Sequence, residues 1–231
     1  MPAGRCDDAA PQGLERVLSL PEVPRLQRDR HGDRPRARRR RRCLFVTEAP
    51  LPVLVSSEPL VASGYLHVVR DTIRFANGHE AERTVVEHPG AVALVVTDEA
   101  GRWLLVRQYR HPAKRNLREI PAGTREVGEP PELTAAREVR EETGFAAGKL
   151  EQIGGAFMAP GFSAEFITFY LATDLRADPL PQDHDEYIEA PEWLTLDEVY
   201  GAVDDGRIED AKTMVALTLY ARYLARNSVT Q

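Results

Sequence analysis

The order of apolar and polar residues predicts several short strands in the first three quarters of the chain. The segment VLVSSEPLVASGYLHVVRDTIRF, which starts at residue 53, is typical of short strands, and ANG at 76–78 marks a turn before ERTVVEH. The run GAVALVVTD at 90–98 predicts a buried strand, with WLLVRQYR at 103–110 as its hairpin partner. FITFYLATDL at 166–175 predicts a further strand.

Helical patterns lie between and after these strands. Residues 131–143 are expected to form a helix, because Pro130 and Pro131 suit a helix start and Gly144 suits its end. Apolar residues at spacings of three and four predict a helix at 211–226, and another is expected at 196–205. Strands joined by short turns and mixed with helices indicate an α+β fold with a mixed sheet on which the helices pack.

Composition excludes some classes of protein. The chain has 231 residues, and 42% of them are hydrophobic, which is enough for an ordinary core. No apolar run approaches the roughly 18 residues that a membrane span needs, and the N-terminus does not resemble a secretion signal. The only cysteines are Cys6 and Cys43, so we expect no disulfide framework and a cytoplasmic protein that does not bind membranes.

The charge is unevenly distributed along the chain. Residues 1–43 contain twelve arginines and six acidic residues, a formal charge of +6, so the remainder carries −12 within a total of −6. The block RPRARRRRR at 34–42 lies in a segment too poor in apolar residues to order itself. It is either a nucleic-acid-binding or localisation arm or, as we favour, an extension without a role. A further alternative, which we suspect, is that the true start lies downstream, near Val46. We therefore predict a disordered tail at 1–45, a β-rich region at 46–88 and a catalytic domain at 89–231.

The stretch REVREETGF, Arg137–Phe145, concentrates acidic residues on one turn of the predicted helix. Glu138 and Glu142 are four residues apart and share a face, with Glu141 beside them. Like charges at this spacing repel each other, but clustered carboxylates suit a hard cation such as Mg²⁺. Arg137 is four residues before Glu141 and is able to hold its carboxylate. Taken alone, the stretch also fits a solvated surface helix with mixed ion pairs.

A longer pattern decides between these interpretations. The spacing of fixed residues from Gly123 to Phe145 resembles the box of the Nudix family at every position: Gly123, Glu129, Arg137, Glu138, Val139, Glu141, Glu142, Gly144 and Phe145. The resemblance covers roughly residues 48–226. It implies an α/β/α sandwich, the Nudix fold, and metal-dependent hydrolysis of a nucleoside diphosphate linked to another group.

The resemblance also implies a role for each residue of the box. Glu138 and Glu142 would be the main metal ligands, Glu141 would assist them, and the carbonyl of Ala122 would be a further ligand. Arg137 would orient the carboxylates, so that Arg137 and Glu141 belong to the catalytic set. The expected cation is Mg²⁺, with Mn²⁺ as a second choice.

Three further residues of the box are expected to shape the loop and the helix end. Glu129 would support the loop before the helix. Gly123 and Gly144 would occupy turns, where a missing Cβ allows a positive φ.

The flanks of the box resemble the ADP-ribose pyrophosphatase subfamily. The residues that carry this likeness are LLVRQYRHPAKRNLREIPAGT at 104–124 and Pro160, which lies sixteen residues after Gly144. The likeness implies hydrolysis of ADP-ribose to AMP and ribose 5-phosphate. It also implies a homodimer that exchanges its N-terminal β-rich regions, with both chains contributing to the site and Pro160 near the substrate.

Residues outside the box are expected to bind the substrate. Arg107 and Arg110 suit the phosphates or the adenine ribose, because a guanidinium binds phosphate in a planar fork and stacks on bases. The alternative for both residues is surface ion pairing. Glu119 corresponds to a substrate or metal position, whereas Tyr109 is expected in the core.

The resemblance to the ADP-ribose pyrophosphatases implies that the general base comes from a loop after the box, here 179–198, which would close over the substrate. Glu186 is the first choice, Asp185 the second and Glu189 the third, and His184 is interpreted as solvated.

Three other functions remain to be tested. A Nudix hydrolase of another nucleotide sugar, such as GDP-mannose, would have the same glutamates. A non-catalytic Nudix sensor with a nucleic-acid-binding tail is disfavoured, because the box is intact and the tail shows no helix-turn-helix pattern. Removal of oxidised nucleoside triphosphates fits the flanks of the box less well.

Overall fold

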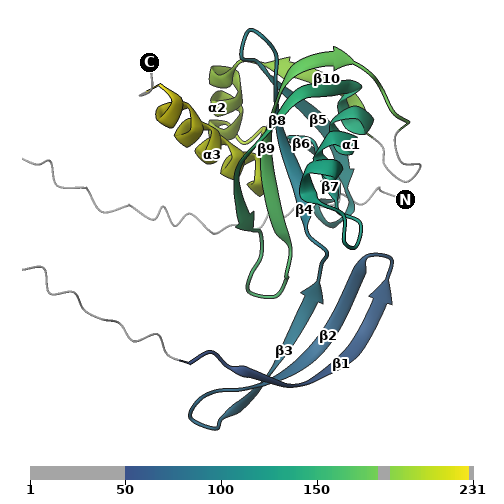
Figure 1. The fold of residues 1–231 in the computed structure, drawn as a ribbon, viewed down its shortest axis with the longest axis vertical. Coiled ribbons are helices and arrows are strands. Elements are labelled where there is room, and N and C mark those ends of the chain that lie inside the picture. The colour runs from purple at the N-terminus through teal and green to yellow at the C-terminus, as the bar shows by residue number, and fades with distance from the viewer. Residues whose placement is uncertain (1–49, 182–187, 229–231) are drawn as a thin grey trace, which may run out of the picture. The chain divides into compact units, whose positions relative to one another are not determined.

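The structure is a computed structural model that describes residues 50–181 and 188–228 (Figure 1). The predicted disordered tail at 1–45 lies outside the described residues, so the domain boundaries stay predictions. None of the helices in the two described ranges combines the length and apolar character that a membrane span requires.

The first three strands form an antiparallel sheet in the order β1-β2-β3. Their bounds are β1 Val53–Ser63, β2 Leu66–Arg74 and β3 Glu80–Glu87. The chain turns between β1 and β2 at Gly64, whose φ of 57° favours glycine. Every residue of β1 is exposed, although the strand is rich in valine and leucine. This sheet is the β-rich region that the alternating sequence pattern predicts.

The remaining strands form one seven-stranded sheet. Along the main path its order is β10-β5-β4-β9-β8, while β6 pairs with β5 and β7 with β4. Only the β4–β9 pair is parallel among these pairings, so the sheet is mixed, as the sequence predicts. The strands are β4 Ala91–Thr97, β5 Trp103–Arg110, β6 Arg115–Glu119, β7 Ala122–Thr124, β8 Phe145–Phe157, β9 Phe166–Ala177 and β10 Ile188–Leu194, with a short 3₁₀ turn η1 at His111–Ala113.

Each of the three described helices ends or begins as its sequence dictates. Helix α1 (Pro131–Thr143) ends at Gly144, whose φ is 76°. Helix α2 (Leu196–Asp204) begins with a capping box in which Thr195 and Glu198 bind each other's backbone N–H groups. Helix α3 (Ala211–Asn227) begins at Asp210, which accepts a hydrogen bond from the N–H of Thr213. The predicted helix ranges are therefore confirmed to within one residue.

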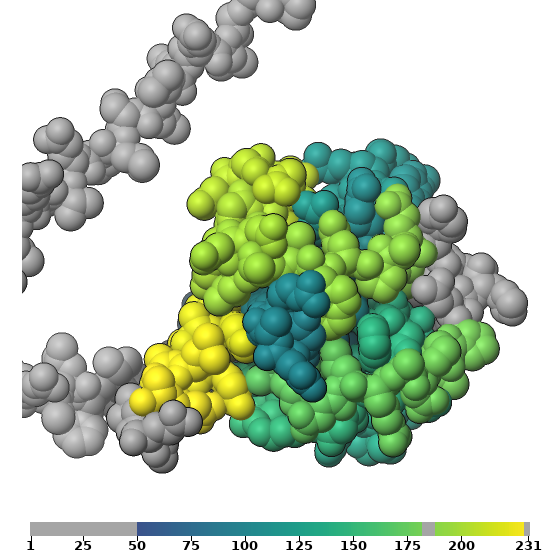
Figure 2. Space-filling view, turned by 90° about the horizontal axis from the view of Figure 1, so that it is seen from above, coloured from purple at the N-terminus to yellow at the C-terminus, as the bar shows by residue number. Residues whose placement is uncertain are grey.

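Strand β4 joins the two halves of the core. Its residues 91, 93 and 95 pack with residues of α2 and α3, whereas residues 92, 94 and 96 pack with Ala135 and Val139 of α1. Since successive side chains of a strand point to opposite faces, α1 covers one face of the sheet and α2 and α3 cover the other (Figure 1). Figure 2 shows α2 and α3, in yellow-green and yellow, together on one flank. The arrangement is the predicted α/β/α sandwich.

Strand β8 is the main element that the sequence pattern does not predict. It is 13 residues long and pairs with β9 along nearly its whole length. Two of its glycines allow close packing, because a Cβ on Gly154 would lie 2.7 Å from Leu219 Cδ2 and one on Gly155 would lie 2.5 Å from Phe166 Cζ. Glycine has a low strand propensity, so tertiary packing rather than local preference forms this strand.

Candidate functional site

The first glutamate of the site lies against the strand that precedes α1. Glu138 is buried, and its carboxylate occupies the space that a side chain on Gly123 would fill. The predicted reason for a glycine at position 123 was a positive φ, and this is wrong, because Gly123 is absent from the residues with positive φ. Gly123 is required by close approach, whereas Gly144, at φ 76°, does use the left-handed conformation.

The second glutamate binds the same strand. Glu142 is buried one helical turn after Glu138, and its Oε2 accepts a hydrogen bond of 3.1 Å from the N–H of Ala122 in β7. In an extended strand the N–H and C=O of one residue point to the same side. The carbonyl of Ala122 therefore opens toward α1, and an oxygen of the main chain joins the two carboxylates on this side of the strand.

Arg137 connects the acidic residues around the loop. Its guanidinium lies 2.6 Å from Glu138 Oε1, 2.8 Å from Glu141 Oε2 and 3.6 Å from Glu129 Oε2. Burial works against its charge, but the neighbouring carboxylates, that of Glu138 first, raise the pKa of Arg137 above its ordinary value. Arg137 is thus a fixed cation to which three acidic residues of the predicted box are attached.

Glu129 closes the loop before α1. Its Oε2 accepts a hydrogen bond of 3.1 Å from the N–H of Glu126, and its own carbonyl accepts one of 3.0 Å from Arg125 Nε. Burial acts to raise the pKa of Glu129, but the bond from Glu126, the hydrogen bond with Thr134 and the charge of Arg137 together lower it. These contacts connect Glu129 to the backbone of the loop and to Arg137, and its role in supporting the loop stays a prediction.

The donor set of this site fits a divalent cation chemically. Two buried carboxylates and a main-chain carbonyl are the hard oxygen ligands that Mg²⁺ prefers. Within residues 50–181 and 188–228, however, no group of three or more His, Cys, Asp or Glu side chains is arranged so that it could hold a metal ion. Arg137 contacts the carboxylates of Glu138 and Glu141. Binding of a cation by this set would therefore require Glu138 to exchange its contact with Arg137 for one with the metal.

The two predicted substrate arginines are held by acidic residues on neighbouring strands. Arg107 of β5 lies 3.3 Å from Glu189 of β10, and the two residues are paired in the sheet. Arg110 donates two hydrogen bonds of 2.8 Å to Glu119 of β6. Asn116 donates a further bond of 2.7 Å to Glu189. Glu189, the third choice for the general base, is therefore already bound by two side chains.

The end of β5 differs from the sequence prediction in one respect. Tyr109 was expected in the core, and this is wrong, since the residue is 46% exposed and its hydroxyl lies 3.4 Å from His111 Nδ1. Gln108 is buried in its place. The alternation of a strand explains both observations, because residues 106 and 108 face the interior whereas residues 107 and 109 face outward.

The other predicted residues lie apart from the glutamates or outside the described ranges. Pro160 is exposed in the turn between β8 and β9, whose Phe162 carbonyl accepts a hydrogen bond from Val86 of β3. Glu186, Asp185 and His184 lie outside the described residues. Their roles, and those of the box residues, stay predictions.

Sequence analysis missed one charged residue beside the predicted set. Lys212 of α3 is only 8% exposed, and its amine contacts Glu119. Burial, followed by the nearby charge of Arg110, acts to lower the pKa of Lys212, whereas the carboxylates of Glu119 and Asp210 favour the charged amine. The signal was present in the sequence, because Lys212 lies four residues before Ala216 and eight before Tyr220, on the apolar face of the predicted helix.

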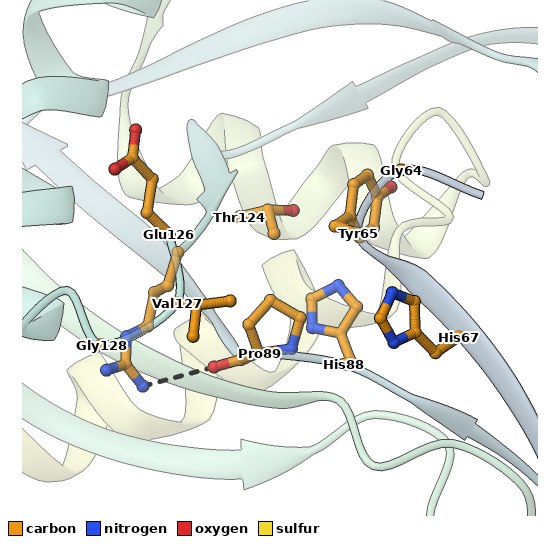
Figure 3. Close-up of a pocket in the computed structure, with 10 residues that line it drawn as sticks. Gly64, Tyr65, His67, His88, Pro89, Thr124, Glu126, Val127 and Gly128 are labelled. Carbon is orange, nitrogen blue, oxygen red and sulfur yellow. Dashed lines mark hydrogen bonds between the residues drawn. The ribbon is translucent and has the colours of Figure 1, made fainter. Parts of the chain in front are cut away.

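A separate cavity of about 620 Å³ lies between the box loop and the turn from β1 to β2 (Figure 3). Tyr65 and His88 line it with their rings in edge-to-face contact at 5.4 Å, and residues 124–128 form the opposite wall. None of the predicted site residues lines this cavity. The loop after Gly123 therefore has one end at the glutamates, while its residues 124–128 border a second hollow.

Comparisons with known proteins indicate the family. Residues 87–217 match the NUDIX domain. An ADP-ribose pyrophosphatase of Bacillus subtilis (strain 168) is 36% identical over 165 residues, which cover 71% of this chain and 89% of the relative. An ADP-ribose pyrophosphatase of Mycobacterium tuberculosis (strain ATCC 25618 / H37Rv) is 47% identical over 133 residues, which cover 57% of this chain and 64% of the relative.

A solved structure gives the same fold. The crystal structure of an ADP compounds hydrolase has a TM-score of 0.68 and covers 78% of this chain and 97% of its own. Its sequence identity is 22%, so this likeness concerns the fold alone.

Proposed function

The chain belongs to the Nudix hydrolase family, and we propose that it hydrolyses the pyrophosphate bond of ADP-ribose to AMP and ribose 5-phosphate. The observation that carries this proposal is the convergence of Glu138 and Glu142 on the strand at Ala122 and Gly123. The names of the two relatives described above support ADP-ribose as the substrate.

The acidic site requires a cation, because a diphosphate is itself an anion and buried carboxylates repel it. We propose Mg²⁺, with Mn²⁺ as the second choice, held by Glu138, Glu142 and the carbonyl of Ala122. When bound, such an ion neutralises phosphate charge and lowers the pKa of a water molecule. Arg137 keeps the carboxylates oriented, and Glu141 is the assisting ligand that Arg137 positions.

The protein's own cations would bind the substrate beside this centre. Arg110 donates only two of its five N–H groups to Glu119, so three point away from that carboxylate. Arg107 is 48% exposed and is held by a single acidic residue at 3.3 Å. Both guanidinium groups are available for phosphate or ribose oxygens. Asn116 and Arg107 both bind Glu189. The proposed proton acceptor therefore remains Glu186, with Asp185 as the second choice.

We propose that the protein acts as a homodimer through its N-terminal sheet. Strand β1 exposes Val53, Leu54 and Val61, and a contiguous apolar strand on a small sheet is typical of a covered surface. A second copy of the chain is the covering partner that the family resemblance implies.

The activity is tested by incubating the full-length protein and Mg²⁺ with ADP-ribose, GDP-mannose, NADH, a diadenosine polyphosphate and 8-oxo-dGTP. We expect AMP and ribose 5-phosphate to form fastest from ADP-ribose. Glu142→Gln keeps an acceptor for the N–H of Ala122 but removes the charge, so kcat should fall by about 10²- to 10³-fold, as when a group that stabilises transition-state charge is removed.

The control is Glu132→Gln, the same change at an exposed position in the first turn of the same helix. This variant should keep the wild-type kcat. Faster turnover of GDP-mannose or 8-oxo-dGTP would overturn the substrate assignment and leave the Nudix chemistry. Binding of ADP-ribose without turnover of any compound would favour a sensor.

A further inference from the structure

A cluster of four charged side chains lies beside the box, and none of its members is a residue of the box. Its members are Arg110 at the end of β5, Glu119 at the end of β6, Asp210 at the start of α3, and Lys212 in the first turn of α3. Glu119 is only 1% exposed, and Lys212 is 8% exposed. Removing charges from water to this extent costs several kcal/mol per ion unless close partners compensate.

Glu119 is the centre of this cluster. Its Oε1 accepts a bond of 2.8 Å from Arg110 Nε, and its Oε2 accepts one of 2.8 Å from Arg110 Nη2 and also contacts Lys212 Nζ. Lys212 Nζ lies 3.2 Å from Asp210 Oδ1. Two cations and two anions thus balance one another, and one carboxylate is shared by both cations.

Arg110 is the most exposed member of the cluster. The side chain of Arg110 is 37% exposed, whereas those of Glu119 and Lys212 are buried. The two donors that bind Glu119 lie on one edge of the guanidinium, so the other three N–H groups face away from the cluster. The guanidinium of Arg110, whose orientation Glu119 fixes, is therefore the part of the cluster that a ligand reaches most readily.

The short segment that leads from the end of β6 to the start of β7 links this cluster to the glutamates of the box. The N–H of Ile120 donates a bond of 3.0 Å to Thr213 Oγ1 of α3, and two residues later the N–H of Ala122 binds Glu142. Glu119 and Ala122 are three positions apart in the sequence, which places their Cα atoms within about 10 Å of each other. Arg110 and the box glutamates are thus held by opposite ends of one short segment.

We propose that Lys212 is a positioning residue for the hydrolysis, which holds Glu119 so that Arg110 presents its free edge to the diphosphate of the substrate. This inference rests on the proposed function, because it assigns the anion that Arg110 binds. The competing explanation is that Lys212 only fastens α3 to the sheet. Fastening alone affects stability, whereas positioning affects substrate binding through Arg110.

The test compares Lys212→Met with the wild type in the full-length protein. Methionine keeps the length and removes the charge, so Glu119 loses one of its two cations. We expect KM for ADP-ribose to rise about tenfold with kcat changed by less than about threefold, the pattern of lost binding rather than lost chemistry. Lys149→Met is the control, since Lys149 is an exposed lysine on β8 that also pairs with a glutamate, and it should leave KM unchanged.

A double-mutant cycle separates the two explanations. If Lys212 acts through Arg110, then Lys212→Met should change KM by less than about twofold once Arg110 is replaced by alanine. The same comparison by calorimetric Kd of ADP-ribose, in a Glu142→Gln background, does not depend on turnover. Should Lys212→Met fail to fold, Glu119→Gln keeps the shape of the cluster and should raise KM in the same way.

Two results would overturn the inference. One is a lower Tm of Lys212→Met with KM and Kd unchanged. The other is a double variant whose rise in KM equals the product of the rises caused by Lys212→Met and by Arg110→Ala alone. If the wild type hydrolyses a different member of the substrate panel, the proposed function fails. The Lys212 comparison is then made on that substrate and is decided by the same KM criterion.

Discussion

Strands β1 and β4 both contain several valine or leucine residues, but their environments are opposite. Every residue of β4 is buried, and every residue of β1 is exposed. Strand β4 lies between β5 and β9, with helices on both faces of its sheet, whereas β1 is an edge strand whose neighbour in the described sheet is β2. Apolar composition therefore predicts that a strand needs to be covered, and only the surrounding elements determine whether the same chain covers it.

The two sheets differ accordingly in what they can stabilise alone. The seven-stranded sheet has a core on each face, which contains residues from strands and helices far apart in the sequence. A three-stranded sheet with an exposed apolar edge strand is marginal by itself and offers a template for pairing with another chain. Three pairs of substitutions test this difference, each with one change in the N-terminal sheet or its turn and one in the domain built on the seven-stranded sheet.

The largest effect is expected for a leucine in the covered sheet. Leu94→Ala in β4, where the residue is 0% exposed, should lower the free energy of unfolding by about 2–5 kcal/mol, because it removes buried methyl groups and leaves a cavity. Leu54→Ala makes the same change in β1, where the residue is 57% exposed. In dilute protein it should cost no more than about 0.5 kcal/mol.

Urea denaturation over a range of protein concentrations measures both values. The cost of Leu54→Ala should grow with protein concentration if a second copy covers β1, because association contributes to stability by mass action. An equal cost for the two variants in dilute protein would show that β1 is covered within one chain and would end the comparison.

The next effect concerns the surface of β1 itself. The double variant Val53→Glu, Val61→Glu would place two charges in an apolar contact, and unpaired buried charges cost several kcal/mol. We expect the dimer Kd to rise by at least about 100-fold, which corresponds to about 2.8 kcal/mol. Sedimentation velocity over a range of concentrations measures the change.

A matched control uses the other sheet's helical cover. Leu224→Glu changes an exposed leucine of α3 in the same way and should leave the dimer intact. Dissociation by Leu224→Glu, or a dimer unaffected by the β1 variant, would place the interface elsewhere.

The same contrast between local and distant contacts explains what sequence could predict. Helices α1 and α3 and strands β4 and β5 have strong periodic patterns, and the structure confirms their ranges. Strand β8 has glycines at positions 148, 154 and 155, and its formation depends on β9 and α3. Local preference is weak there, so no pattern of the segment alone predicts a strand.

The candidate site shows the same limit. The spacing from Gly123 to Gly144 predicts that the box residues act together, because the helix brings Glu138 and Glu142 onto one face. The contact of Lys212 with Glu119 spans 93 residues, and no local spacing encodes it. Gly123 illustrates a further difficulty. Its importance was predicted from a positive φ, whereas the structure requires a glycine there because the Glu138 carboxylate lies so close.

The smallest effect is expected for a pair of glycines, Gly123 in β7 and Gly64 in the turn between β1 and β2. Gly123→Ala would place a methyl group where the Glu138 carboxylate lies, so this side chain must move away from the strand. We expect kcat/KM to fall at least about tenfold, or about 1.4 kcal/mol of transition-state stabilisation, because the proposed cation would lose a ligand in its proper place.

Gly64→Ala, in the turn between β1 and β2, meets no atom within 4 Å but has a φ of 57°. It should lower the free energy of unfolding by about 1 kcal/mol, the cost of a left-handed conformation for alanine, and leave kcat/KM unchanged. Activity measured beside urea denaturation separates the two costs. A Gly123→Ala enzyme with normal kcat/KM would mean that the carboxylate of Glu138 does not need its place against the strand, and the site as proposed would then be wrong.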